Sequence, residues 1–273
     1  MSSKSVILII VIYLLVGCNK SDDKTFEEPA PRTYQDIEND FKAFDFTPGV
    51  NYFYVQSYGH ENARYYNFEI ILPSAEDSEK KPLIVYFPVP DLEYNNGQYS
   101  YVHPKCLLEA MAESMEAVIL IFDSWYYFFL GDRSKDEEMK VTMIELATKY
   151  LNVNPSKILV TGFGYGANDA FYFAENYPEL FSAAIPIHGF QEIPLSPEEI
   201  KIIRTPMYLI FGEYRFTQAE PTLIQMESFV QQANNLGSNI TLIIAPTVGT
   251  TQCDYVPYLK NGIDWLQTEV WIE

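Results

Sequence analysis

The sequence predicts an α/β domain in which a predominantly parallel central sheet is covered by helices on both faces. Near-continuous apolar runs, such as "KKPLIVYFPVP" at 80–90, are typical of strands that are buried on both faces of a sheet. These runs alternate along the chain with helix-like segments, and strands joined by helices usually pair in parallel. The chain has 273 residues, 48% of them hydrophobic, which is enough for one well-packed α/β core.

The expected elements follow one another from about residue 52 to the end of the chain. We expect strands at 64–73, 80–90, 116–124, 156–163, 181–189, 205–213 and 239–246. We expect helices at 106–115, 135–151, 167–178, 219–237 and 256–271. Acidic residues occupy the first turn of the helix at 135–151, where they suit the helix dipole. No linker is evident in this region, so we expect one domain over residues 46–273.

The first residues resemble the signal of a bacterial lipoprotein. Lys4 precedes the apolar run "VILIIVIYLLVG", which is short for a membrane-spanning helix. The run ends in "LLVGC", which matches the lipobox, where small residues precede a cysteine that becomes lipidated. The resemblance implies a signal peptide at 1–17 and lipidation of Cys18. An ordinary signal peptide or anchor with an incidental cysteine is the alternative.

The segment after Cys18 is predicted to be a flexible tether over residues 18–45, because it is polar, acidic and contains proline. Its acidic cluster resembles the surface-export signal of Bacteroidota lipoproteins. We therefore expect a protein held by lipid in a bacterial outer membrane and exposed at the surface. The formal net charge of −19 argues against nucleic acid as a partner, since phosphates would be repelled.

Two cysteines remain in the expected domain, Cys106 and Cys253. An oxidising compartment would permit a disulfide between them, whereas a buried free thiol fits each of them equally well. The sequence leaves both alternatives open.

Three glycines at alternate positions lie between a strand and a helix, in "VTGFGYGA" at 160–167. One interpretation is a dinucleotide-binding fingerprint, because Gly162, Gly164 and Ala167 fit G-x-G-x-x-G/A. Such a site needs a carboxylate at the end of the next strand, where this chain has His188. The other interpretation is the G-x-S-x-G nucleophile elbow of a hydrolase, with glycine in place of the central serine.

The stretch "KILVTGFGYGANDAFYFAENYPELFSAAIPIHG" resembles esterases of the α/β-hydrolase superfamily, such as feruloyl esterases and polyhydroxybutyrate depolymerases. The resemblance extends over most of residues 50–270, from the entry strands "RYYNFEIILP" and "KPLIVYF" to "PMYLIFGEYR" and "ITLIIAPTVGTTQC". It implies the α/β-hydrolase fold and, in an active member, a serine, an acid and a histidine.

Each part of that machinery is altered in this chain. Gly164 stands where the resemblance places the serine, and glycine offers no nucleophile. Arg215 stands where the acid is expected, with Glu213 two residues before it. Thr250 stands where the histidine is expected, and a hydroxyl cannot accept and return a proton near neutral pH. No histidine follows His188, so no shift of register restores a base.

The loop expected to bind the oxyanion is altered too. It reads "YFPVPD", and Pro88 and Pro90 have no backbone N–H to donate. We therefore predict a catalytically inactive, esterase-like protein without cofactor or metal. An active carboxylic ester hydrolase with non-standard residues, and a structural subunit with an empty cleft, are the alternatives.

Aromatic residues cluster at the expected ends of several strands. Tyr94 follows the strand at 80–90, Trp125 and Tyr126 follow the next strand, and Tyr165 is adjacent to Gly164. Together with His188, these residues are our candidates for a ligand cleft, because flat amphipathic rings suit stacking on sugars or burial against a protein. Core packing is the alternative for each ring. The expected partner is a glycan, an ester-bearing ligand or a protein.

Overall fold

The computed structural model describes residues 32–56, 65–74, 78–95, 98–102, 105–122, 133–189, 197–213, 221–246 and 251–272. The strands of its main sheet are β1 (Gly49–Gln56), β2 (Tyr65–Leu72), β3 (Lys81–Phe87), β6 (Val118–Phe122), β7 (Val153–Phe163), β8 (Ala183–Ile187), β9 (Met207–Gly212) and β10 (Ile240–Ala245). The α-helices are α2 (Tyr34–Ala43), α3 (Lys105–Ser114), α5 (Arg133–Tyr150), α6 (Tyr165–Asn176), α7 (Leu223–Asn235) and α8 (Val256–Trp265).

The eight strands lie in the order β1-β2-β6-β3-β7-β8-β9-β10. β1, β2 and β6 are joined by antiparallel pairings, and all the pairings from β6 to β10 are parallel. The predominantly parallel sheet predicted from the sequence is therefore confirmed. Because the parallel strands point the same way, the segments that follow β3, β6, β7, β8, β9 and β10 leave the sheet at the same end.

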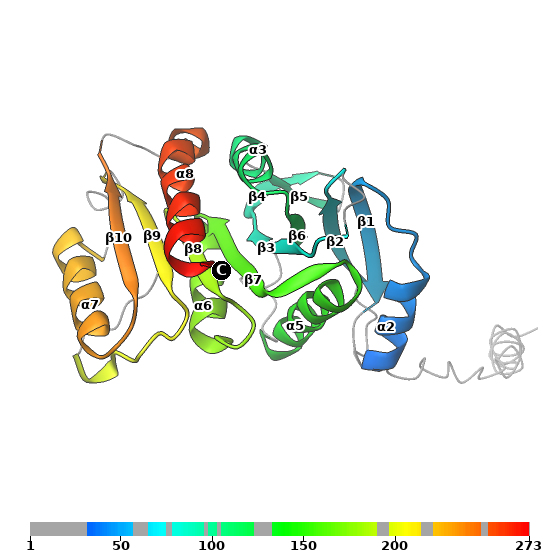
Figure 1. The fold of residues 1–273 in the computed structure, drawn as a ribbon, viewed down its shortest axis with the longest axis horizontal. Helices are drawn as coiled ribbons and strands as arrows, with labels where there is room; N and C mark the ends of the chain where they lie inside the picture. Colours follow the sequence, from blue (N-terminus) through cyan, green and yellow to red (C-terminus); the bar gives the residue numbers. More distant parts are fainter. Residues whose placement is uncertain are drawn as a thin grey trace, which may run out of the picture. The chain divides into compact units, whose positions relative to one another are not determined.

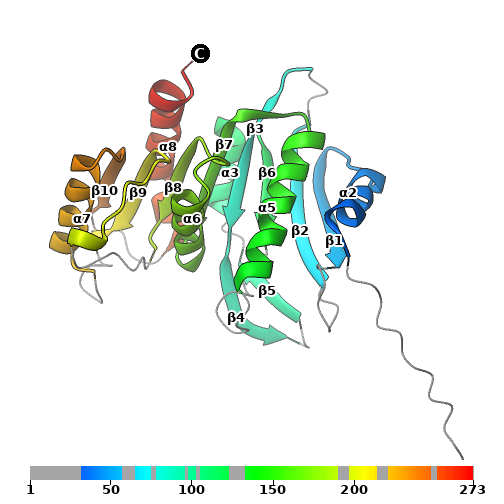
Figure 2. The ribbon, with the colours of Figure 1, turned by 90° about the horizontal axis from the view of Figure 1, so that it is seen from below.

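Helices cover both faces of the sheet (Figures 1 and 2). On one face, α2, α5, α6 and α7 enclose the larger core cluster. On the other face, α3 and α8 enclose a second cluster. Strands buried between two layers expose no polar side chain to water on either face, which explains runs such as Leu83–Phe87.

A small two-stranded sheet follows β3 directly. It consists of β4 (Val89–Asn95) and β5 (Gln98–Val102), which pair antiparallel with Val89 opposite Val102 and Tyr94 opposite Tyr99. From the sequence we expected a loop here, because "VPDLEY" before "NNGQ" contains proline and two acidic residues, which are depleted in strands. Only the run after it, "YSYV", has a composition typical of strands.

The assignment of residues 18–45 to a tether is wrong for its second half, because residues 34–43 form helix α2. Thr33 caps this helix and forms a capping box with Asp36. Ile37 and Phe41 point into the main core, where the Phe41 ring lies 5.4 Å from that of Phe53. Two apolar residues one turn apart are enough to attach a helix that otherwise has a polar composition. No helix in the described part of the chain has the length and apolar character needed to cross a membrane.

Helix α2 is also attached by a buried carboxylate. Lys149 Nζ donates to Glu38 Oε1 at 2.7 Å, and the Tyr150 hydroxyl donates to the same oxygen at 2.6 Å. These two hydrogen bonds, with that of Lys149 the stronger, lower the pKa of Glu38 from 4.5 to about 2.

The lowered pKa of Glu38 predicts an acid-sensitive contribution to stability. Because the folded pKa lies below the unfolded one, the contribution is complete above about pH 4.5 and is lost as the pH falls toward 2. Glu38→Gln should therefore show a flatter dependence of the unfolding free energy on pH in this window, measured by urea titration at each pH. Glu227→Gln, at an exposed position of α7, is the control and should follow the wild type. An equally steep acid dependence in Glu38→Gln would contradict the prediction.

Candidate functional site

The three glycines form a sharp turn from β7 into α6. β7 ends at Phe163, Gly164 has φ 57° and ψ −120°, and α6 begins at Tyr165. The Gly164 N–H donates to the Ile187 carbonyl at 3.0 Å, and the Gly164 carbonyl accepts from the Ala167 N–H at 3.1 Å. A positive φ is disfavoured for residues with a side chain, and this strand–turn–helix geometry is that of a nucleophile elbow. It favours the hydrolase interpretation over the dinucleotide fingerprint.

The two flanking glycines have a different physical cause, which is close packing of backbone. A Cβ on Gly166 would lie 2.0 Å from the Phe87 carbonyl oxygen. A Cβ on Gly162 would lie 2.4 Å from the carbonyl oxygen of Gly166. The end of β3 and the first turn of α6 therefore cross at a distance that only glycine allows.

There is room for a side chain at Gly164 itself. A Cβ there would lie 3.4 Å from Val89 Cγ2, an ordinary van der Waals distance. The positive φ of the backbone, and not crowding by neighbouring atoms, is therefore the reason for glycine at this position. Val89 begins β4, so the hairpin of β4 and β5 starts beside the apex of the elbow.

A cluster of three rings lies next to the elbow. The rings of Phe163 and His188 stack with centroids 5.7 Å apart, and the Tyr255 ring lies 5.4 Å from Phe163 and 5.2 Å from His188. Tyr255 belongs to a short helix, η3 (Gln252–Tyr255), that leads into α8. His188 is 4% exposed and Tyr255 is fully buried. The cluster joins the ends of β7 and β8 to the segment after β10.

His188 is held by hydrogen bonds to its ring and to its backbone. The Tyr255 hydroxyl lies 2.6 Å from His188 Nδ1, and the Gly212 N–H donates to the same nitrogen at 3.4 Å. Which of the two groups donates in the Tyr255–His188 contact depends on the tautomer of the imidazole. Burial raises the pKa of the Tyr255 hydroxyl. The backbone of His188 has φ 55°, and its backbone N–H donates to the Ile210 carbonyl at 2.7 Å.

A disulfide fixes this end of the molecule. Cys106 in α3 and Cys253 in η3 are bonded, with their Cα atoms 5.6 Å apart. The sequence left this pairing open, and the structure forms it. Closing a loop of 147 residues contributes roughly 5 kcal/mol in the chain-entropy model. The bond also holds Tyr255, two residues further on, near the ends of the strands.

The predicted site residues are only partly described. Gly164 lies at the apex of the elbow, and Tyr165 beside it is 41% exposed. His188 lies at the same end of the sheet but inside the ring cluster. Tyr94 lies on β4, the first strand of the hairpin beside the elbow. The other four candidates, Trp125, Tyr126, Arg215 and Thr250, lie outside the described residues.

Phe163 and Tyr255 were not recognised from the sequence as part of this site. Tyr255 comes only two residues after Cys253, so a disulfide assignment would have drawn attention to it.

Glu213 directly follows β9 and is exposed. Among the described residues, no group of three or more His, Cys, Asp and Glu side chains could hold a metal ion.

Parts of the chain are similar in sequence to a hydrolase family and to two proteins from Aquifex. Residues 128–239, which include the elbow, match the dienelactone hydrolase family. "Putative carboxymethylenebutenolidase" of Aquifex aeolicus (strain VF5) is 35% identical over 60 residues, and "Protein usf" of Aquifex pyrophilus is 36% identical over 61 residues. Each match covers 22% of this chain and 25% of the relative, so it spans about a quarter of those proteins.

Solved esterase structures share the fold. Thermogutta terrifontis esterase 2 has a TM-score of 0.56 at 16% identity, covering 82% of this chain and 96% of that one. An α/β-hydrolase enzyme from a Medee basin deep-sea metagenome library has a TM-score of 0.57 at 13% identity, covering 83% and 100%. The chain therefore has the α/β-hydrolase fold, and the sequence matches support the superfamily predicted for it.

The backbone conformation of the elbow predicts that a serine at position 164 lowers the stability of the protein. Gly164→Ser should lower the free energy of unfolding by about 1–3 kcal/mol, because a side chain is strained at this φ. Urea unfolding checks this, with Tyr165→Ser, one residue further on and exposed, as a control that should change stability by less than about 0.5 kcal/mol. A Gly164→Ser variant as stable as the wild type would show that the elbow is not strained.

Proposed function

We propose that this protein is a non-catalytic relative of the serine esterases that binds a ligand or a partner at the end of the sheet where the elbow lies. The observation that carries the proposal is Gly164, which occupies the apex of a well-formed elbow and has no side chain to attack an ester. Retention of the elbow without its nucleophile is expected of a fold that is kept for a purpose other than hydrolysis.

The surrounding residues support the loss of chemistry. A serine esterase needs a base that takes the proton of the nucleophile, and the chain has no histidine after β10 to act as one. Two prolines, at 88 and 90, follow β3, where a backbone N–H would be needed for an oxyanion. Acting together, these changes would remove the nucleophile, the base and part of the transition-state stabilisation.

The alternative is an active carboxylic ester hydrolase with non-standard residues. In the described part of the chain, its best candidate is the Tyr255–His188 pair, in which a hydroxyl lies 2.6 Å from an imidazole nitrogen. Tyr255 is fully buried, and burial raises the pKa of its hydroxyl, which makes it a poor nucleophile. This pair is therefore better explained as packing than as catalysis.

A chemical probe separates the two functions. The purified protein should take no label from a fluorophosphonate and should not hydrolyse p-nitrophenyl acyl esters, with an active serine esterase as the positive control. Gly164→Ser should also remain unlabelled, because a serine without a base is a poor nucleophile. Stoichiometric labelling of the wild type, mapped by mass spectrometry, would establish the alternative.

For the binding role, the ligand we favour is a neutral glycan or an ester-bearing saccharide. Several solved structures with this fold are esterases, and the net charge of −19 disfavours polyanionic ligands. Tyr165 is a half-exposed ring directly after Gly164, at the start of α6. An aromatic ring there can stack on a sugar face and donate through its hydroxyl.

The proposed binding role predicts that removal of the Tyr165 ring weakens or abolishes ligand binding. On an array of plant and microbial glycans, Tyr165→Ala should lose a positive signal of the wild type or weaken it several-fold, since a stacked ring contributes about 0.5–1.5 kcal/mol. Ile224→Ala removes an exposed side chain of α7 and is the control, expected to bind as the wild type. Binding that is equal in Tyr165→Ala and the control would place the ligand elsewhere.

We further propose that the protein is anchored by lipid at Cys18 and displayed at the surface of a bacterial outer membrane. The lipobox "LLVGC" supports the anchor, and the acidic residues after it support export. The Cys106–Cys253 disulfide supports an oxidising compartment. Metabolic labelling with a palmitate analogue tests this, and a Cys18→Ala variant that still incorporates the analogue would rule out Cys18 as the site.

A further inference from the structure

Strand β1 forms one edge of the main sheet and leaves one of its two faces open to solvent. Phe53 and Val55 point into the core cluster that α2 helps to enclose. Val50, Tyr52 and Tyr54 alternate with them and point to the other face, where these residues are 51%, 53% and 63% exposed. In Figure 1, α3 and α8 cover other strands on that face and do not reach β1. Three large side chains are therefore exposed in a row along one strand.

The open surface continues onto the neighbouring strand β2. In the antiparallel register Tyr54 lies opposite Asn67 and Tyr52 lies opposite Glu69, and directly opposed residues share a face of the sheet. Glu69 is buried, whereas Asn67 is only partly buried. We call Val50, Tyr52, Tyr54 and Asn67 the β1 platform. β1 lies four strands from β7, which carries the elbow, and this is roughly 19 Å at the usual strand spacing.

The rings of Tyr52 and Tyr54 offer stacking surfaces, because more than half of each residue is exposed. A ring that lies flat on the sheet shows one face to solvent, and a ring that stands upright shows both. Residues two apart on a strand are separated by about 7 Å, so the two rings form a short row along β1. Flat amphipathic rings in a row suit the apolar C–H faces of consecutive sugars.

The platform is uncharged, although the protein is strongly acidic. β1 reads "GVNYFYVQ", which contains no charged residue, whereas the whole chain has a net charge of −19. Glu69, the carboxylate of β2 that faces this side, is 7% exposed. An anionic ligand would be repelled by the protein as a whole, and a neutral ligand would not. The platform therefore suits a neutral ligand.

Asn67 adds a polar group whose hydrogen-bonding capacity is not used. Its Oδ1 is buried and has no hydrogen-bond partner in the described part of the chain. A buried acceptor without a donor is unfavourable, and a hydroxyl group of a ligand would supply the donor. Because Asn67 is only partly buried, a rotation of its amide brings this oxygen to the surface. A ligand rich in hydroxyl groups therefore fits the platform better than a purely apolar one.

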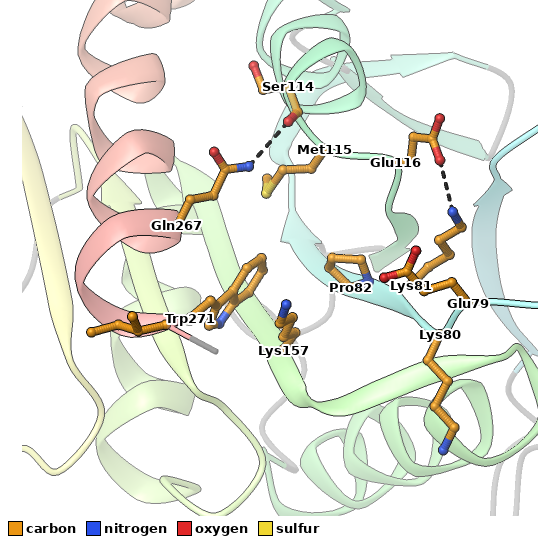
Figure 3. A pocket seen from close by; sticks show the side chains of 11 residues that line it. Glu79, Lys80, Lys81, Pro82, Ser114, Met115, Glu116, Lys157, Gln267 and Trp271 are labelled. Atoms are coloured by element: carbon orange, nitrogen blue, oxygen red, sulfur yellow. Dashed lines mark hydrogen bonds and ion pairs between the residues drawn. The ribbon is translucent and has the colours of Figure 1, made fainter.

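The hollow of ≈ 510 Å³ near the start of β3 differs from the platform, because its polar lining is already paired (Figure 3). Lys81 Nζ and Glu116 Oε2 lie 2.8 Å apart, and Lys157 and Glu79 each have an interaction partner as well. Among the described residues, none of the buried polar atoms that lack a hydrogen-bond partner belongs to this lining. We therefore place no ligand in it.

From these features we propose that the β1 platform binds a neutral, unbranched β-1,4-linked polysaccharide, whose sugars stack on Tyr52 and Tyr54 and whose hydroxyl groups bond to Asn67. An open, flat row of rings fits a straight chain, and β-1,4 linkage keeps a glycan chain straight with flat faces. A stable protein interface buries about 800 Å² on each partner, which is more than three side chains in a row supply. The site does not depend on the function proposed for the elbow.

The probes are the β-1,4-linked hexasaccharides of glucose, N-acetylglucosamine and mannose, with maltohexaose as a coiled counterpart. Calorimetric titration of the full-length protein should show saturable binding of at least one of the three, and weaker binding of maltohexaose. Tyr52→Val and Tyr54→Val remove a ring but keep a residue that favours strands, and each should weaken binding several-fold. Tyr54→Phe keeps the ring and should bind within about threefold of the wild type.

The matched control is Tyr34→Ala, which removes an exposed ring of α2 and should leave the affinity unchanged. A measurement without variants is nitration of the wild type by tetranitromethane, mapped by mass spectrometry. A saturating hexasaccharide should protect Tyr52 and Tyr54 and leave Tyr34 as reactive as before. No binding of any of the three probes, or unchanged nitration of Tyr52 and Tyr54, would overturn the proposal. A loss of binding in Tyr165→Ala but in neither β1 variant would also overturn it, while leaving the function proposed for the elbow intact.

Discussion

The crossing of two backbone segments at the elbow constrains the whole centre of this molecule. The first turn of α6 lies so close to the end of β3 that a Cβ on Gly166 would be 2.0 Å from the Phe87 carbonyl oxygen. The atoms that a Cβ on Gly166 would meet belong to the backbone, so no change of rotamer can relieve the clash. Glycine is therefore required there whatever the chemistry of the site. The position of α6 on its face of the sheet and the departure of β4 at Val89 both follow from this crossing.

The glycine motif therefore expresses two constraints that differ in origin. Gly162 and Gly166 are needed for packing, and they would be needed in an active enzyme and in an inactive one alike. Gly164 has room for a Cβ and is exceptional only in its φ of 57°. An active esterase tolerates that strain because the residue performs chemistry. Without chemistry, glycine removes the strain and keeps the turn, which is why an elbow can outlast its nucleophile.

The sequence predicted the strands that are buried on both faces and the helices between them, but not strand β1, the β4–β5 hairpin or helix α2. The buried strands and the helices on both faces were found, because apolar runs and helical spacing are local signals. Helix α2 was missed since its buried side chains, Ile37, Glu38 and Phe41, lie within a polar, acidic stretch. The disulfide was undecidable, because its cysteines are 147 residues apart. Tyr255 could not be linked to His188 either, because they are 67 residues apart and only the fold brings them together.

The Tyr255–His188 contact also bears on our proposal that this end of the sheet does not hydrolyse esters. A general base must accept a proton from the nucleophile and return it, so its acceptor nitrogen must face the reacting groups. Nδ1 of His188 lies 2.6 Å from a buried hydroxyl, and the ring is stacked on Phe163. The Cys106–Cys253 bond holds Tyr255 in this position. The segment after β10 thus contributes a hydrogen-bonding partner of His188 and one cysteine of a disulfide, which agrees with the non-catalytic role that we propose.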